Sequence, residues 1–205
     1  YIIIAGEPGI GKTALASQLV KTHGWVHHFN IAAQNICSTR QFLNNICSQL
    51  IIRYKLDYSY LPEEAGLNSS FLSQLLAEAV AKKPQESVYI MVDALDEAKS
   101  ERLAPRANHL YMPPSLPDGI FIIVTTREKV EYRLVVDRSR NIFIGDDDPE
   151  NLADIEAYIL KFIEEQSSMA QRIVDWQVTE KDFVAILVDK SQGNFMYLVH
   201  VLRDI

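Results

Sequence analysis

The architecture of this chain follows from Gly6-Glu7-Pro8-Gly9-Ile10-Gly11-Lys12-Thr13, which comes directly after the apolar run Tyr1-Ile2-Ile3-Ile4-Ala5. The segment matches the pattern G-x-x-x-x-G-K-[S/T], in which a buried strand leads into a glycine-rich loop and the loop leads into a helix. Backbone N–H groups of such a loop surround phosphate oxygens, and glycines permit the close approach that this requires. The pattern therefore predicts a nucleoside triphosphate with Mg²⁺ as ligand. The alternative is an ordinary glycine turn.

Each residue type in this segment has a chemical task in phosphate binding. Lys12 supplies a point charge for the β- and γ-phosphates, and Thr13 supplies a hydroxyl for the magnesium ion. The helix that begins near Gly11 directs its positive end at the same phosphates. The residues that we expect to bind the nucleotide are Gly6, Glu7, Pro8, Gly9, Ile10, Gly11, Lys12, Thr13 and Ala14.

A second motif places carboxylates after a later strand. The apolar residues Ile90-Met91-Val92 end in Asp93, and ligands of open α/β sheets bind at the carboxyl ends of the strands. We expect Asp93 to hold Mg²⁺ together with Thr13, directly or through water. Asp96 and Glu97 are candidates for orienting or deprotonating an attacking water. The alternatives are a strand-ending aspartate in a turn, and acids that merely begin a helix.

A third motif, Thr125-Thr126-Arg127, follows another apolar strand. If this strand neighbours the strand of Asp93, Arg127 can reach the γ-phosphate and sense its presence. Spacing in the sequence does not establish that the strands are adjacent. The alternative is a structural arginine that pairs with a nearby acid.

Composition narrows the class of protein. The chain has 205 residues, of which 48% are hydrophobic, and this is enough for one α/β domain with a small helical appendage. A net charge of −7 argues against nucleic acid and anionic membranes as partners. Cys37 and Cys47 suit reduced, buried thiols of a cytoplasmic protein better than a disulfide or a metal site. We expect a soluble protein, and the missing initiator Met suggests a piece of a longer one.

Apolar runs alternate with helical patterns, which is typical of a parallel sheet with crossover helices. Beyond the first strand and helix, we expect strands at 25–31, 87–92, 119–125 and 141–144, helices at 40–53 and 69–82, and a proline-rich connector at 112–119. Ser38 or Thr39 is expected to cap the first of these helices. Adjacent strand residues point to opposite faces, so one of His27 and His28 should be packed and the other should lie near the surface.

The pattern of the sequence changes from strands alternating with helices to helices alone near residue 149. Helical patterns cover 151–165, 179–190 and 196–202, and no strand pattern follows. We therefore place a nucleotide-binding domain at 1–148 and a helical subdomain at 149–205. The acidic run Asp146-Asp147-Asp148 is interpreted as a solvated loop that caps the next helix.

These motifs together resemble the NACHT branch of the STAND NTPases, most of all bacterial proteins that carry C-terminal repeats. The distinguishing feature is the small residue Ala94 directly after Asp93, with the acids displaced to Asp96 and Glu97. NB-ARC proteins and many AAA+ ATPases have a second acid at that position. The segments around Asn30, 110–119 and 192–198 are similar as well, and the resemblance covers essentially the whole chain.

The resemblance implies a P-loop NTPase fold with three layers. Its five-stranded parallel sheet would have the order 5-1-4-3-2 and be followed by a helical subdomain that ends before a winged-helix region. It also implies a cytoplasmic switch that binds ATP or ADP with Mg²⁺, hydrolyses ATP slowly and gates homo-oligomerisation. Partners would be the C-terminal repeats and an N-terminal effector of the same protein, with no membrane or nucleic acid. The alternatives are an AAA+-like motor and a nucleotide-gated scaffold that does not hydrolyse.

Overall fold

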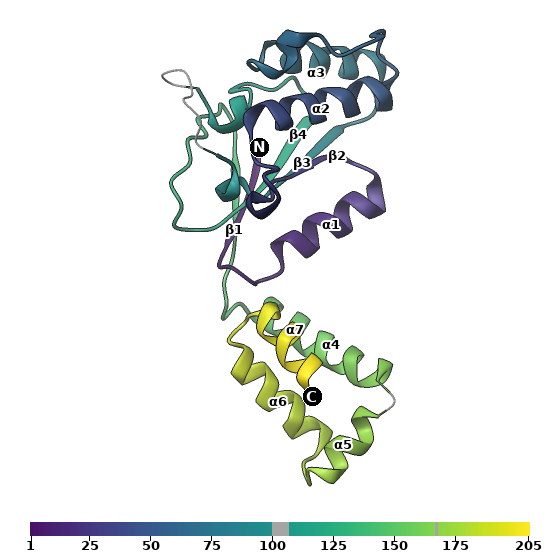
Figure 1. Cartoon of the computed structure of the whole chain (residues 1–205), viewed down its shortest axis with the longest axis vertical. Coiled ribbons are helices and arrows are strands. Elements are labelled where there is room, and N and C mark those ends of the chain that lie inside the picture. Colours follow the sequence, from purple (N-terminus) through teal and green to yellow (C-terminus); the bar gives the residue numbers. More distant parts are fainter. Residues whose placement is uncertain (100–106, 167) are drawn as a thin grey trace. The chain divides into compact units, whose positions relative to one another are not determined.

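The computed structural model of the chain describes residues 1–99, 107–166 and 168–205 (Figure 1). It divides into two compact units. The first contains Tyr1–Ala5 and Thr13–Ile142, and the second contains Gly6–Lys12 and Phe143–Ile205. In the described part of the chain, no helix is both long and apolar enough to cross a membrane.

The sheet is the framework of the α/β part. Its five strands are β1 (Ile2–Gly6), β2 (Val26–Phe29), β3 (Val88–Asp93), β4 (Ile120–Thr126) and β5 (Arg140–Ile144). They lie in the order β2-β3-β4-β1-β5, which is the expected order read from the other edge. The pairs β2·β3, β3·β4 and β1·β4 are parallel. The prediction of a five-stranded parallel α/β sheet is thus confirmed.

Parallel strands require crossover connections, and helices supply those from β1 to β2 and from β2 to β3. Helix α1 (Lys12–His23) joins β1 to β2, while α2 (Thr39–Tyr54) and α3 (Ser70–Lys82) lie between β2 and β3. Helices α2 and α3 cover one face of the sheet and α1 lies on the other (Figure 1). Helix α2 begins with a capping box in which the Ser38 hydroxyl accepts from the backbone N–H of Gln41, as expected for one of the two proposed caps.

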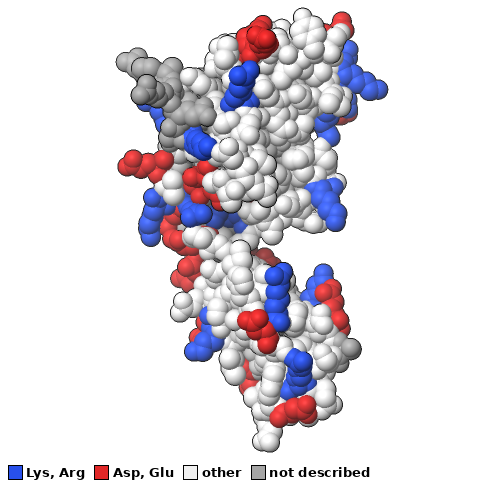
Figure 2. Space-filling view, viewed as in Figure 1, with Lys and Arg blue, Asp and Glu red and all other residues white. Residues whose placement is uncertain are grey.

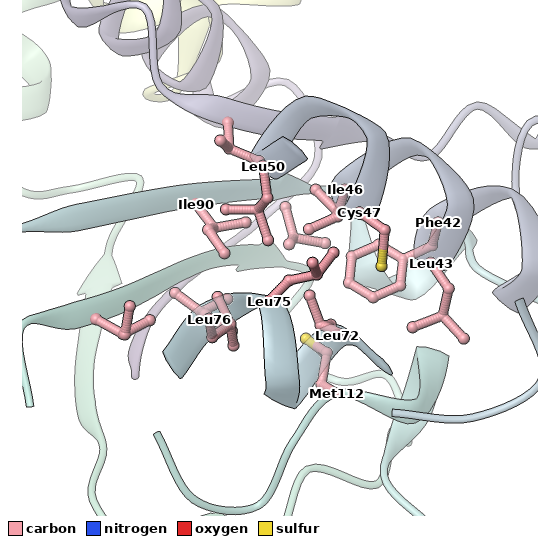
Figure 3. Packing of buried hydrophobic residues seen from close by; sticks show 14 of the residues in the cluster. Phe42, Leu43, Ile46, Cys47, Leu50, Leu72, Leu75, Leu76, Ile90 and Met112 are labelled. Atoms are coloured by element: carbon pink, nitrogen blue, oxygen red, sulfur yellow. The ribbon is translucent and has the colours of Figure 1, made fainter. Parts of the chain in front are cut away.

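The main hydrophobic core lies between the sheet and the helices α2 and α3 (Figure 3). Period-3.6 spacing places one stripe of each helix against the strands. The fully buried side chains labelled in the figure are Phe42, Leu43, Ile46, Cys47 and Leu50 of α2, Leu72, Leu75 and Leu76 of α3, and Ile90 and Met112. Both cysteines are buried and unbonded, as expected, and burial raises the pKa of the Cys47 thiol to about 12.

In its described residues, the second unit carries four helices, α4 (Pro149–Glu165), α5 (Met169–Asp175), α6 (Glu180–Ser191) and α7 (Phe195–Asp204). They surround their own apolar cluster, which includes Ile155, Ile159, Leu187, Leu198 and Leu202. Asp148 caps α4 by accepting from the N–H of Glu150, which confirms the interpretation of the acidic run. Helix α5 was not predicted, because its seven residues are too few for a clear period.

The two adjacent histidines of β2 differ as expected. His28 is 2% exposed and packs edge-on against Phe42, whereas His27 is only partly buried. Burial, with a smaller contribution from the charge of His27, lowers the pKa of His28 to about 4. The folded protein therefore keeps the His28 imidazole neutral over a range in which an unfolded chain would protonate it.

This difference predicts a pH dependence of stability. The unfolded chain binds a proton at His28 below about pH 6.5, and the folded chain resists it down to about pH 4, so the free energy of unfolding should fall across this window. At about 1.36 kcal/mol per pKa unit, the loss reaches at most about 3 kcal/mol. Urea unfolding between pH 7 and 4 should give a shallower decline for His28→Gln than for the original chain. A matched change at the exposed His200, His200→Gln, should leave the slope unchanged, and equal slopes for all three would contradict the assignment.

Candidate functional site

The glycine-rich segment joins β1 to α1, as its pattern predicted. Gly6 ends β1, Lys12 begins α1, and Thr13 and Ala14 follow in the first helical turn. Gly9 and Gly11 have φ values of +85° and +99°, a left-handed region that side chains with a Cβ rarely enter. The loop therefore needs glycine at both positions.

Within this loop the ammonium group of Lys12 lies over the backbone. Its Nζ donates to the carbonyl oxygen of Gly6 at 2.7 Å and to that of Glu7 at 2.9 Å. A flexible, strongly hydrated lysine head can exchange such carbonyl contacts for phosphate oxygens of similar reach. The loop thus presents both backbone N–H groups and a positive charge.

Within the second unit, which includes Gly6–Lys12, the start of α7 makes contacts with the loop that sequence reasoning did not assign. The side chain of Asn194 caps α7 by accepting from Met196 N–H, and its Nδ2 donates to the Pro8 carbonyl at 3.1 Å. The N–H of Phe195 donates to the Gly9 carbonyl at 2.9 Å. A Cβ on Gly9 would overlap the amide of Asn194, so a second constraint requires glycine there. In the sequence, Asn194 and Phe195 stand out only as part of the segment 192–198, which contributes to the family resemblance.

The carboxylate of Asp93 lies at the end of β3, where the motif placed it. It is 2% exposed and both of its oxygens accept hydrogen bonds. The Thr13 hydroxyl donates to Oδ2 at 2.8 Å, and the Thr125 hydroxyl at the end of β4 donates to Oδ1 at 2.5 Å. The predicted pair of Thr13 and Asp93 is therefore brought together, from positions 80 residues apart.

The backbone around Asp93 is held as firmly as its side chain. The N–H and the Nδ2 of Asn30, just after β2, both donate to the Asp93 carbonyl, at 3.2 and 2.8 Å. The next residue, Ala94, has φ +51° and donates its N–H to the Thr125 hydroxyl. A left-handed non-glycine residue costs about 1–2 kcal/mol, which is tolerated where the surroundings demand the turn. Asn30 was missed as a site residue; its signals in the sequence were an amide at a strand end and a place in one of the segments that carry the family resemblance.

The left-handed turn at Ala94 leads into the 3₁₀ turn Leu95–Glu97, which brings the displaced acids to Arg127. Asp96 is 5% exposed at its side chain, and it accepts from the Nε of Arg127 at 2.9 Å and from its backbone N–H at 3.2 Å. This is the pairing that the structural alternative for Arg127 predicted. A role of Arg127 in sensing a γ-phosphate stays a prediction.

Glu97 makes a different connection. Its Oε2 accepts from the N–H of Ala32 at 2.9 Å, while its Oε1 lies 3.9 Å from the Nη2 of Arg127. Its side chain is 33% exposed, so it reaches water, unlike that of Asp96. The two acids, which the sequence treated alike, thus differ in burial and in partners.

The Thr13 hydroxyl and the Asp93 carboxylate are oxygen donors of the kind that Mg²⁺ prefers. Among the described residues, no group of three or more His, Cys, Asp or Glu side chains could hold a metal ion. A site with few protein oxygens suits Mg²⁺, because this ion keeps several waters and binds substrate phosphates. These residues therefore fit a magnesium ion that accompanies a nucleotide.

Charged side chains of both signs lie on the surface of the protein, whose net charge is −7. On the face in view, Lys and Arg side chains alternate with Asp and Glu side chains and are separated by wide uncharged areas (Figure 2).

A comparison with protein families finds a match over more than half of the chain. The family described as Nephrocystin 3, N-terminal matches residues 1–127 of the 205-residue chain. The matched span includes β1 to β4 and the candidate residues from Gly6 to Arg127. No curated protein matches the sequence.

The hydrogen bonds of Asp93 predict a stability effect at Thr125. Valine has the same shape as threonine and a similar preference for strands, but it has no hydroxyl. Thr125→Val therefore removes the hydrogen bond that Asp93 Oδ1 accepts and the one that the Ala94 N–H donates. An unsatisfied buried polar group costs about 1–3 kcal/mol, so urea unfolding should report a loss of at least about that size. The same change at the exposed Thr22 of α1 should cost less than about 0.5 kcal/mol. Equal effects of the two variants would show that the Thr125 hydroxyl does not support Asp93.

Proposed function

We propose that this chain, which belongs to the Nephrocystin 3 N-terminal family, binds ATP with Mg²⁺ and hydrolyses it slowly as a nucleotide switch. The observation that carries the proposal is the hydrogen bond from Thr13 to Asp93. It joins the residue after the phosphate-loop lysine to the acid at the end of β3, and these two motifs bind triphosphate and magnesium in P-loop NTPases.

Each residue has a proposed task. The backbone from Gly6 to Ala14 surrounds the phosphates, and Lys12 neutralises the β- and γ-phosphates. Thr13 and Asp93 hold the magnesium ion, which would offset the negative charge that develops on the phosphate oxygens. Thr125 and Asn30 position Asp93 without themselves contacting the nucleotide.

Hydrolysis requires a water oriented toward the γ-phosphorus. The oxygen of that water forms a new P–O bond, the bond to the β-phosphate oxygen breaks, and ADP and inorganic phosphate are released. Of the two acids, Glu97 is the better candidate to orient the water and take its proton, because it is partly exposed. Asp96 is buried against Arg127 and positions that arginine.

The hydrogen bonds that Glu97 and Arg127 already make within the protein support a slow reaction. Glu97 already accepts the N–H of Ala32, and Arg127 is held by Asp96, so neither is oriented solely toward a substrate. A slow site of this kind suits a switch, in which the lifetime of the bound nucleotide sets the lifetime of a conformation. It does not suit a motor such as an AAA+ ATPase.

At a finer level, we assign the chain to the NACHT branch of the STAND NTPases and to a bacterial signalling or defence protein. Ala94 after Asp93, followed by Asp96 and Glu97, supports this assignment. Appended repeats would sense a partner, and nucleotide-dependent opening would permit homo-oligomerisation and engage an effector, in the cytoplasm.

A second candidate is a nucleotide-gated scaffold that does not hydrolyse. The ion pair of Arg127 with Asp96 favours it, because both groups can be structural. The two candidates share nucleotide binding and differ only in turnover.

Nucleotide binding is tested at Lys12. Lys12→Ala removes the positive charge of the loop and should weaken binding of ATP with Mg²⁺ by about 100-fold or more in isothermal titration calorimetry. Lys21→Ala, in the last turn of the same helix, is the matched control and should change affinity by less than about twofold. Normal affinity of the Lys12 variant would mean that the loop does not bind phosphate.

Hydrolysis is tested by steady-state release of phosphate. We expect a turnover below about one per second, and Glu97→Gln should lower it by about 100-fold because the water loses its carboxylate. Glu86→Gln, just before β3, is the control and should leave it unchanged. A turnover well above one per second would contradict the switch, and intact ATP binding with no turnover in the original chain would establish the scaffold.

A further inference from the structure

A large groove lies in the second unit, and none of its lining residues is assigned above to nucleotide binding. Its volume is about 980 Å³, near the upper end of the range for ligand pockets in proteins. Its walls come from α4, α6 and the segments just before α4 and after α6. It is formed entirely by residues of the second unit.

The groove has the form that receives a helix. On α4 its lining residues are Leu152, Glu156 and Leu160, which are four apart and hence lie along one stripe. On α6 the stripe includes Val184 and Val188. At about 1.5 Å per residue, the lining extends over about 12 Å on α4, from Leu152 to Leu160, and over about 14 Å on α6, from Glu180 to Asp189, which matches two to three helical turns.

The lining residues of the groove are of two chemical kinds. The apolar ones, called the floor below, are Leu152, Leu160, Val184, Ala185 and Val188. The charged ones, called the rim below, are one lysine, Lys181, and five carboxylates, Asp146, Asp147, Glu156, Glu180 and Asp189. Apolar side chains along one stripe, flanked by cations, would therefore complement this surface. The same acidic rim disfavours phospholipid headgroups and nucleic acid.

We propose that the groove between α4 and α6 binds an amphipathic helix of another protein, with Leu-like side chains on one stripe and Lys or Arg on both flanks. The apolar stripe covers the floor, and the cations face the five carboxylates. The proposal does not depend on nucleotide binding at the phosphate loop.

The test uses the whole chain and a synthetic peptide of about four helical turns, with leucine on one stripe and lysine on both flanks. Fluorescence anisotropy of the labelled peptide should show saturable binding that weakens as salt is raised. A peptide with the same leucine stripe and glutamate flanks should bind at least about tenfold more weakly. Equal binding of the two peptides would overturn the proposal.

Variants at exposed positions locate the site without disturbing the core. Ala185→Arg places a large side chain on the floor, and Glu156→Lys together with Asp189→Lys reverses the charge at two rim positions. Each of these two variants should weaken binding of the lysine peptide at least about tenfold. Glu164→Lys is the matched control for the change at Glu156, since it makes that charge change on α4 outside the groove, and it should change affinity by less than about twofold. Circular dichroism checks that each variant is folded.

Three further results would overturn the proposal. The first is peptide binding that Ala185→Arg leaves unchanged, because the peptide would then bind elsewhere. The second is self-association of the chain in sedimentation that Ala185→Arg abolishes, because a second copy would then be the occupant. The third is binding of the chain to vesicles with anionic headgroups that exceeds binding of the lysine peptide.

Discussion

The carboxylate of Asp93 is the point on which the arrangement of the site depends. It is nearly inaccessible to water, and a buried charge is tolerated only when hydrogen bonds replace the lost hydration. Thr13 and Thr125 supply those bonds from the start of α1 and the end of β4, and Asn30 secures the adjacent backbone from the end of β2. One carboxylate thus ties together three strand ends and one helix start.

A second set of contacts extends from this point along the chain. The left-handed residue Ala94 turns the backbone so that Asp96 reaches Arg127, and Glu97 reaches the N–H of Ala32. A substitution of Arg127 would therefore alter contacts both at the end of β4 and in the segment after β2. In the proposed switch, Glu97 would couple Arg127 to the segment after β2, because it contacts both.

Much of the fold could be predicted because its signals are local. Strands β3 and β4 are continuous apolar runs, as expected for strands buried on both faces, and α2 and α3 carry helical periods. Helix α5 was missed because it is short, and the contacts of Asn194 with the phosphate loop were missed because 186 residues separate Asn194 from Pro8. No pattern within a single segment reports a contact of that separation.

In the candidate site, too, some features follow from local sequence and others only from the tertiary structure. The sequence alone predicts phosphate and magnesium chemistry from the residue types and spacing of Gly6 to Thr13 and of Asp93 to Glu97. That chemistry requires glycine, lysine, a hydroxyl and a carboxylate in a fixed local order. The folded chain alone distinguishes Asp96 from Glu97, since burial and partners depend on where β4 and the segment after β2 lie. It alone also reveals the acid-rimmed groove, because two helices must pack before their stripes form one surface.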